Sequence, residues 1–245
     1  MIEIVPLTGI GEVQPGDDLA ATLRMALERA DLTRRAGDVL VVTQKIVSKA
    51  EGRFVALGAV APGEEALRLA DITRKDPQLV QLVLDESSDI VRAVPHVLIA
   101  RHRLGHVMAN AGIDRSNIGA GDEDRALLLP VDPDASAARL HAELGFPVVI
   151  SDSFGRPWRM GVVAVAIGAA GLPALHDRRG EMDRDGRILE VTQVALADIV
   201  ATAACLATGE GAEGIPAALL RGCPLDGPSR PAADLVRPGH EDLFR

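Results

Sequence analysis

Residues 146–171, FPVVISDSFGRPWRMGVVAVAIGAAG, decide the fold class of this chain. The stretch opens with a short apolar run, FPVVIS, and closes with a second, VVAVAIGAAG, and each predicts a buried strand. Outside this stretch, helical and strand patterns follow one another without a regular βαβ rhythm. The sequence therefore predicts an α+β fold with mixed or antiparallel sheets and flanking helices.

Apolar periodicity predicts the remaining elements of a single domain spanning residues 1–245. Helices are expected over 17–30, 64–75, 76–93, 134–145 and 191–209, and further strands over 37–47, 96–105 and 106–113. The polar stretch 173–190 predicts a mobile excursion from the body. The Pro-rich tail, 224–245, predicts irregular structure packed over it.

Composition excludes several classes of protein. Hydrophobic residues make up 47% of the chain and charged residues 25%, as in an ordinary globular protein. Aromatic residues make up only 2% and the net charge is -9, which argues against a nucleic-acid partner. No 18-residue apolar span and no signal peptide is present, so we expect a soluble cytoplasmic protein without a membrane partner. Cys205 and Cys223 are expected to be free thiols, and Trp158 a packing residue.

The glycines Gly209, Gly211 and Gly214 form the chain's one G-x-G-x-x-G motif, and no P-loop motif occurs. The motif follows a helix instead of a strand, which is the wrong context for a Rossmann site. It is either a helix cap and turn or a loop whose backbone N–H groups approach phosphate. Glu210 within it would repel phosphate unless a metal ion lay between them.

Other polar residues also follow buried runs. Asp152 and Ser153 come just after a strand, where their oxygens suit Mg²⁺ or Mn²⁺, although an Asx-turn would have the same sequence. Lys45 and Lys49 are placed near a strand end, where they either neutralise phosphate or are simply solvated. With Asp114 and its neighbouring amides, these residues predict a metal-bridged phosphate site beside a pocket for an anionic substrate. The chemistry alone predicts a nucleotide- and metal-dependent transferase, hydrolase or ligase.

Five segments in order along the chain carry a resemblance: GDDL, VVTQKIVSKAEGR, HVMANAGIDRSN, SDSFGRPWRMGVVAVAIGAAG and GEGAEGIPAALLRG. They resemble the successive motifs of the coenzyme F420-0:L-glutamate ligase family, also called γ-glutamyl ligase or CofE. The resemblance implies a CofE-like fold in an intertwined homodimer whose active sites lie near the subunit interface. It also implies the single-domain form, without a C-terminal flavin-binding domain.

The activity implied is GTP-dependent addition of L-glutamate to coenzyme F420-0. The first glutamate forms an amide with the lactyl carboxylate, and later ones are γ-linked. The acceptor carboxylate is phosphorylated by GTP, and the amine of glutamate attacks the resulting acyl phosphate, with release of GDP and phosphate. The implied cations are Mg²⁺ or Mn²⁺, two per site, with K⁺ as a further one.

The resemblance also assigns roles to residues. The metal ligands it implies are Asp114, Asp152, Ser153 and Glu210. The nucleotide contacts it implies are Ile10, Gly11, Glu12, Val13, Gln44, Lys45, Lys49, Asn117, Gly209, Gly211, Ala212 and Gly214. Relatives often read Leu-Pro-Leu-Ile where this chain has residues 10–13. Asp114, Asp152 and Lys49 are expected to be catalytic. Arg156 and Arg159 are our own candidates for binding the anionic substrate.

Two alternatives use the same residues. A metal-dependent nucleotide phosphohydrolase would release GDP whether or not glutamate and its acceptor were present. A non-enzymatic GTP-binding protein would bind nucleotide without turnover. The motifs favour the ligase, because they span the chain and include more than phosphate contacts.

Overall fold

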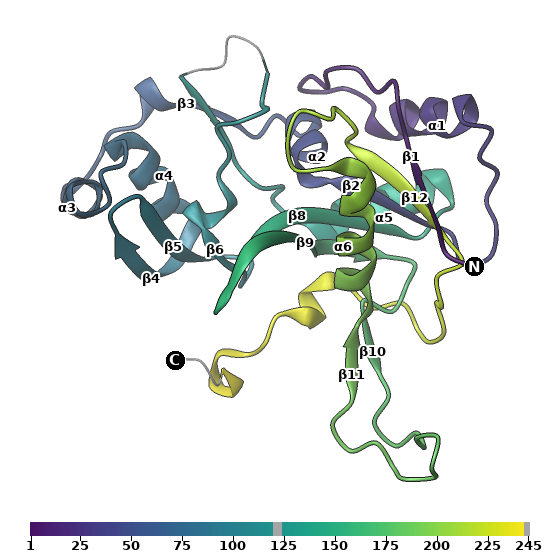
Figure 1. Ribbon diagram of the computed structural model, residues 1–245. Coiled ribbons are helices and arrows are strands. Elements are labelled where there is room, and N and C mark those ends of the chain that lie inside the picture. Colours follow the sequence, from purple (N-terminus) through teal and green to yellow (C-terminus); the bar gives the residue numbers. More distant parts are fainter. Residues whose placement is uncertain (120–123, 243–245) are drawn as a thin grey trace.

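A five-stranded mixed sheet forms the centre of the molecule in the computed structural model, which describes residues 1–119 and 124–242 (Figure 1). Its strand order is β1-β12-β2-β8-β9. The strands are β1 (Glu3–Pro6), β12 (Ala217–Arg221), β2 (Val39–Thr43), β8 (Val148–Arg156) and β9 (Arg159–Ala170). β2 and β8 pair in parallel and every other neighbouring pair is antiparallel. The predicted mixed α+β class is therefore confirmed.

Residues 146–171 form the β8–β9 hairpin, the longest strand pair of the sheet. Its register runs from Val148 opposite Ala170 to Arg156 opposite Arg159. Both predicted strands are present, and their pairing continues through the polar residues between them, with register shifts after Ile150 and Gly155. Backbone hydrogen bonds hold these polar residues in strand geometry, so their side chains project from a rigid element.

Six α-helices and three smaller sheets complete the described part of the chain. The helices are α1 (Leu19–Arg29), α2 (Gln44–Ala50), α3 (Glu64–Thr73), α4 (Pro77–Glu86), α5 (Pro133–Leu144) and α6 (Leu196–Thr208). The smaller sheets are β4 (Ser87–Val94), β5 (Val97–His102) and β6 (Val107–Ala109); β3 (Phe54–Ala56) with β7 (Arg125–Leu127); and β10 (Leu175–Asp177) with β11 (Gln193–Ala195). Short 3-10 helices are η1 (Leu57–Ala59), η2 (Asn110–Gly112), η3 (Ala232–Leu235) and η4 (Gly239–Glu241).

The central sheet is buried on both faces. Leu40 and Val42 of β2 pack with α1, α2 and α5 on one side, whereas Val39 and Val41 pack with α6 on the other. All four side chains have no exposed surface. Alternate residues of a strand point to opposite faces, so a strand covered on both sides must be apolar throughout. This burial explains the uninterrupted run VLVV and fixes the position of β2 firmly.

Four predicted elements have the wrong boundaries. The strand expected over 106–113 ends at Ala109, and η2 follows it. The strand expected over 37–47 ends at Thr43, and α2 begins at once with Gln44. The helix expected over 76–93 ends at Glu86, after which β4 pairs with β5. The helix expected from 191 begins only at Leu196, after β11. Each of these changes of conformation takes place within a few residues, and periodicity over so few residues cannot locate it.

Other expectations have mixed outcomes. The predicted strand pair around Gly105 is present as β5 and β6, and residues 173–190 do leave the body, as part of the arm that carries β10 and β11 (Figure 1). Trp158 is 80% exposed, so the expectation that it packs inside is wrong. Cys205 and Cys223 are free thiols, as predicted. Within the described residues, no helix combines the length and apolar character needed to span a membrane.

Gly168 of β9 allows the sheet to approach α5 closely, because glycine has no Cβ. A Cβ at this position would lie 2.4 Å from the backbone oxygen of Pro133, which begins α5. Replacing Gly168 with Ala should therefore destabilise the protein by about 1–3 kcal/mol, because a backbone atom cannot rotate away. Gly155→Ala is the matched control in the same hairpin, since a Cβ there meets no atom within 4 Å. Equal melting temperatures for the two variants would contradict this account.

Candidate active site

A large cavity lies where β2 ends, beside Ser151–Ser153 in the middle of β8. The two strands are parallel neighbours, and Thr43, the last residue of β2, lies opposite Ser151. Strand ends of this kind commonly carry ligand sites. The cavity has a volume of about 610 Å³, within the range of sites for small ligands. It is lined by residues 10–13, 43–46, 49, 117, 119, 151–153, 164, 208–212 and 214–216.

Two carboxylates, Asp114 and Asp152, lie near enough at this cavity to interact electrostatically. Removal from water, and then the negative charge of Asp114, raise the pKa of Asp152 to about 7. Removal from water likewise raises the pKa of Asp114, against the opposing effect of Lys45. Lys45 Nζ lies 3.5 Å from Asp114 Oδ1. Both acids therefore have a raised pKa, so ionising the two together is unfavourable. Lys45 offsets part of their negative charge.

The side-chain amide of Gln44 connects the two acids to α2. Its Nε2 donates a 2.7 Å hydrogen bond to Asp114 and also stabilises the charged form of Asp152. Its Oε1 accepts a 3.0 Å hydrogen bond from Ser48, one helical turn later in α2, and both side chains are buried. Because a hydroxyl hydrogen occupies the oxygen, the amide presents its nitrogen to the acids. α2 therefore both orients a donor and, through Lys45, supplies a cation.

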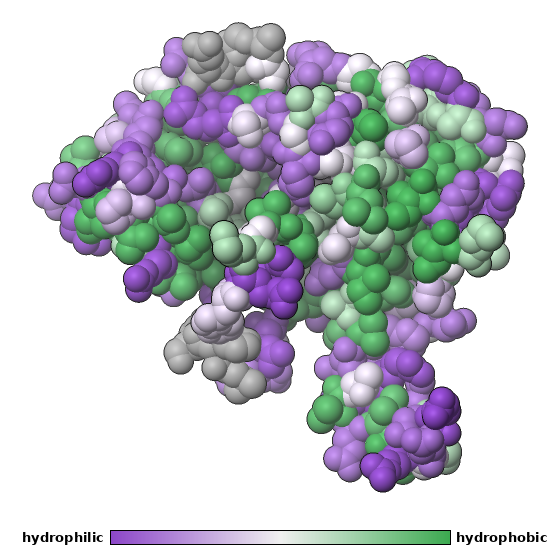
Figure 2. Space-filling view, in the orientation of Figure 1, coloured by the Kyte–Doolittle hydropathy of each residue, from purple (hydrophilic) through white to green (hydrophobic). Residues whose placement is uncertain are grey.

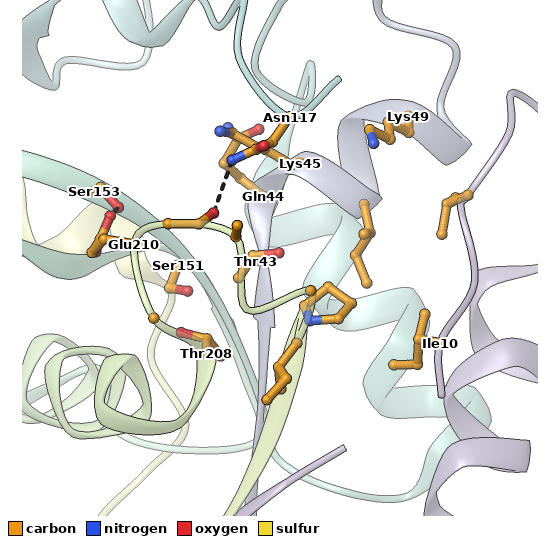
Figure 3. A pocket seen from close by; sticks show the side chains of 18 of the residues that line it. Ile10, Thr43, Gln44, Lys45, Lys49, Asn117, Ser151, Ser153, Thr208 and Glu210 are labelled. Carbon is orange, nitrogen blue, oxygen red and sulfur yellow. Dashed lines mark hydrogen bonds between the residues drawn. The ribbon is translucent and has the colours of Figure 1, made fainter. Parts of the chain in front are cut away.

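The glycine-rich loop after α6 forms the opposite wall. Glu210 Oε2 accepts a 2.6 Å hydrogen bond from Ser153, and its Oε1 accepts one of 3.1 Å from the thiol of Cys205. Asn117 donates from Nδ2 to the backbone oxygen of Gly211 at 3.1 Å (Figure 3). Gly209 has a φ of +69° and its N–H closes the last turn of α6. The loop is thus both a helix cap and a wall of the cavity.

A lysine and a glutamate mark the other end of the cavity. Lys49 on α2 is 5% exposed, and its ammonium donates to the carboxylate of Glu12 in the facing segment 10–13. Ile10, Val13 and Ile46 supply apolar surface at this end. Figure 3 shows Lys49 and Ile10 on one side, Ser153 and Glu210 on the other, with Gln44, Lys45 and Asn117 between them. The cavity therefore has a carboxylate- and hydroxyl-rich end and an apolar end with one ion pair.

Comparison with known proteins decides the family. The model of the F420-0:Gamma-glutamyl ligase family matches residues 9–222. The whole chain is 43% identical to the coenzyme F420:L-glutamate ligase of Methanothermobacter thermautotrophicus, of which it covers 99%. It is likewise 44% identical to that of Methanopyrus kandleri, of which it covers 97%. The chain belongs to the F420-0:gamma-glutamyl ligase family. It is therefore an enzyme of the ligase class, and the resemblance noted in the sequence is confirmed.

The structure of this ligase brings most of the predicted site residues together. All the nucleotide contacts predicted from the resemblance line the cavity, as do Asp152, Ser153 and Glu210, and Asp114 adjoins it through Gln44. Lys45 and Lys49 were expected at a strand end, but both project from α2, which begins at Gln44 directly after β2. Arg156 and Arg159 lie at the turn of the β8–β9 hairpin, outside the lining. Their role, and the individual role of each lining residue, stay predictions.

Sequence reasoning missed three hydroxyl residues of the lining. Thr43 and Ser151 are the paired final residues of two parallel segments, and Thr208 ends α6. The signal for the first two was present, since each is the first polar residue after a buried strand. Using it required knowing that β2 and β8 are neighbours, which their separation of about a hundred residues conceals.

The oxygen atoms of this site fit a hard divalent cation. The donors are carboxylates and a hydroxyl. Removal from water, and then the negative charge of Asp114, raise the pKa of Asp152, and a bound cation would oppose both effects. Among residues 1–119 and 124–242, no three His, Cys, Asp or Glu side chains are arranged to hold a metal by themselves. Mg²⁺ sites typically have one or two carboxylates and take their other ligands from water and phosphate.

The acid pair predicts an unusual dependence of stability on pH in protein treated with a chelator. The pKa of Asp152 is raised from 3.8 to about 7, so the folded state binds a proton that the unfolded chain has lost. Stability should therefore fall as pH rises from about 4 to about 7. Asp152→Asn should abolish this contribution and melt several degrees higher than wild type at pH 8.

The comparison variant is Asp71→Asn, which changes an exposed aspartate of α3. It should melt within a degree or so of the wild type throughout the same pH range. A melting temperature for Asp152→Asn that stays parallel to the wild type from pH 4 to pH 8 would contradict the predicted destabilising ionisation of Asp152.

Proposed function

We propose that this ligase uses GTP to join L-glutamate to coenzyme F420-0, first through the lactyl carboxylate and then through γ-linked glutamates. The observation that carries the proposal is the cavity between the end of β2 and the middle of β8, where acids, lysines and a glycine-rich loop meet. Relatives that share 43–44% of the sequence over its full length are named for glutamate ligation to coenzyme F420. The cavity is large enough for a nucleotide beside a reacting carboxylate.

In this proposal, the phosphates of GTP lie at the carboxylate-rich end. The backbone N–H groups of the loop around Gly211 would approach them, since glycines leave room for close contact. Lys45 would neutralise part of their charge. Asp114, Asp152, Ser153 and Glu210 would hold Mg²⁺ or Mn²⁺, two per site, with K⁺ as a further oxygen-bound cation. When bound, these ions would screen the repulsion between two anions and polarise phosphate oxygens.

The chain's own residues mainly position the reactants. The γ-phosphoryl group of GTP passes to the acceptor carboxylate, which forms an acyl phosphate and releases GDP. The amine of L-glutamate then attacks the acyl carbon, a C–N bond forms, and phosphate leaves with the C–O bond electrons while the amine loses a proton. Such transfers depend on positioning and electrostatics and need no covalent link to the protein.

Arg156 and Arg159, three and six residues beyond Ser153, are our candidates for binding the anionic acceptor or glutamate.

Incubation with GTP, Mn²⁺, L-glutamate and F420-0 tests the proposal. We expect GDP release in step with a gain in the acceptor's mass of one glutamyl residue at a time. Asp114→Asn and Glu210→Gln should lower turnover by about 100-fold or more, because each removes a carboxylate that would hold the divalent cations. Asp71→Asn, far from the cavity, should retain wild-type turnover.

Other products would identify a different activity. GDP release that is independent of the acceptor, without any change in its mass, would contradict the ligase and indicate a phosphohydrolase. Nucleotide binding without either product would indicate a binding protein.

We also propose that the ligase is a homodimer. Apolar side chains are exposed along α6, where Ile199 is 56% and Leu206 is 86% exposed, and Figure 2 shows this apolar surface continuing over the helix. The arm between β10 and β11 exposes Met182 and Ile188 far from the body. Contiguous apolar surface of this kind is typical of an interface between subunits. It supports a second copy packed against α6 and the arm.

Replacing Ile199 with Asp should disrupt this dimer, because the interface would bury an unpaired charge. Light scattering after size exclusion should give twice 25.8 kDa for the wild type and one chain mass for the variant. Leu67→Asp is the matched control, since Leu67 on α3 is similarly exposed, at 53%, but lies in another part of the fold. A wild type that runs as a monomer, or an Ile199 variant that stays dimeric, would contradict the proposal.

A further inference from the structure

We propose that Glu12 and Lys49 read the hydrogen-bonding edge of the nucleotide base and select guanine over adenine. This inference rests on the proposed use of a nucleotide by the ligase and adds the residues that choose its base. It gives Lys49 a role in binding the base in place of the catalytic role that the resemblance implied. The resemblance placed the backbone of residues 10–13 near GTP, but it assigns nothing to the side chain of Glu12, where relatives often have an apolar residue.

The two side chains form one ion pair at the apolar end of the cavity. Lys49 Nζ donates to Glu12 Oε1, and the lysine side chain is only 6% exposed whereas that of Glu12 is 53% exposed. Both residues line the cavity, Lys49 from α2 and Glu12 from the facing segment. The ion pair therefore presents one buried donor and one accessible carboxylate to any ligand that enters this end.

A phosphate group does not suit this end. A carboxylate repels phosphate, and Glu12 is already in contact with the ammonium of Lys49. The other end has what phosphate requires, namely Lys45, the glycine-rich loop and oxygen donors suited to a divalent cation. Ile10, Val13 and Ile46 instead offer apolar surface for the faces of a planar ring. The base of the nucleotide is therefore the part that fits beside Glu12 and Lys49.

The polarity of the ion pair matches guanine and opposes adenine. Guanine has two adjacent donors, N1–H and the N2 amino group, which a carboxylate accepts together, and an O6 acceptor that an ammonium reaches. Adenine has an acceptor at N1 and an amino donor at position 6, so both contacts would become repulsive. Sites that hydrogen-bond a ligand group discriminate strongly against analogues that leave those site groups unpaired.

Calorimetric binding of GDP, IDP and ADP in the presence of Mn²⁺ tests the inference without turnover. Wild type should bind GDP about 100-fold more tightly than ADP, and about 10-fold more tightly than IDP, which lacks the N2 amino group. Glu12→Ala should weaken GDP binding by about 10-fold or more, leave ADP binding no weaker, and make GDP and IDP equivalent. Glu12→Gln, which keeps the size but replaces one acceptor with a donor, should also lose the preference for GDP.

Glu28→Ala, which changes an exposed glutamate of α1 outside the cavity, is the control and should bind all three nucleotides as the wild type does. Unchanged GDP:ADP and GDP:IDP ratios in both Glu12 variants would overturn the inference, as would a wild type that binds the three equally or binds none. Glutamyl transfer is measured separately. Transfer with unaltered base selectivity in Glu12→Ala refutes only this inference, whereas base selectivity that depends on Glu12 without any transfer refutes only the proposed function.

Discussion

The parallel pairing of β2 with β8 is the constraint on which the rest of the site depends. It is the one parallel contact in an otherwise antiparallel sheet, and it places Thr43, the last residue of β2, beside Ser151 of β8. In an antiparallel pair, the polar part of β8 would run away from the start of α2. Because the pair is parallel, α2 and the polar part of β8 start from the same place. A buried, apolar β2, covered by helices on both faces, keeps this arrangement rigid.

Around this edge, the protein concentrates charge at a cost in stability. Asp114 and Asp152 are withdrawn from water and lie close enough to raise the pKa of Asp152 to about 7. Gln44, held by Ser48, and Lys45 offset only part of this repulsion. Functional sites commonly retain such unfavourable groups because their chemistry needs them. The surrounding strands and helices, with their fully buried side chains, supply the stability that the acid pair removes.

Glycine-rich sequence alone could not distinguish a helix cap from a phosphate loop at residues 209–214, and the structure shows that capping the helix does not prevent the loop from lining the cavity. Gly209 ends α6, while Glu210 turns back to Ser153 on β8 and Gly211 contacts Asn117. One segment therefore closes a helix and lines the cavity. Membership of the F420-0:gamma-glutamyl ligase family, from residue 9 to residue 222, covers every one of these elements.

The sequence by itself determined the α+β class, the buried strands, most of the helices and the family. These features depend on local patterns, such as the run VLVV, or on short motifs whose residues are neighbours in the chain. Tertiary structure alone decided where strands give way to helices at Gln44 and Leu196, which strand ends adjoin, and that Lys49 pairs with Glu12 rather than facing solvent. Those outcomes depend on contacts between segments tens of residues apart, and apolar periodicity carries no information about such contacts.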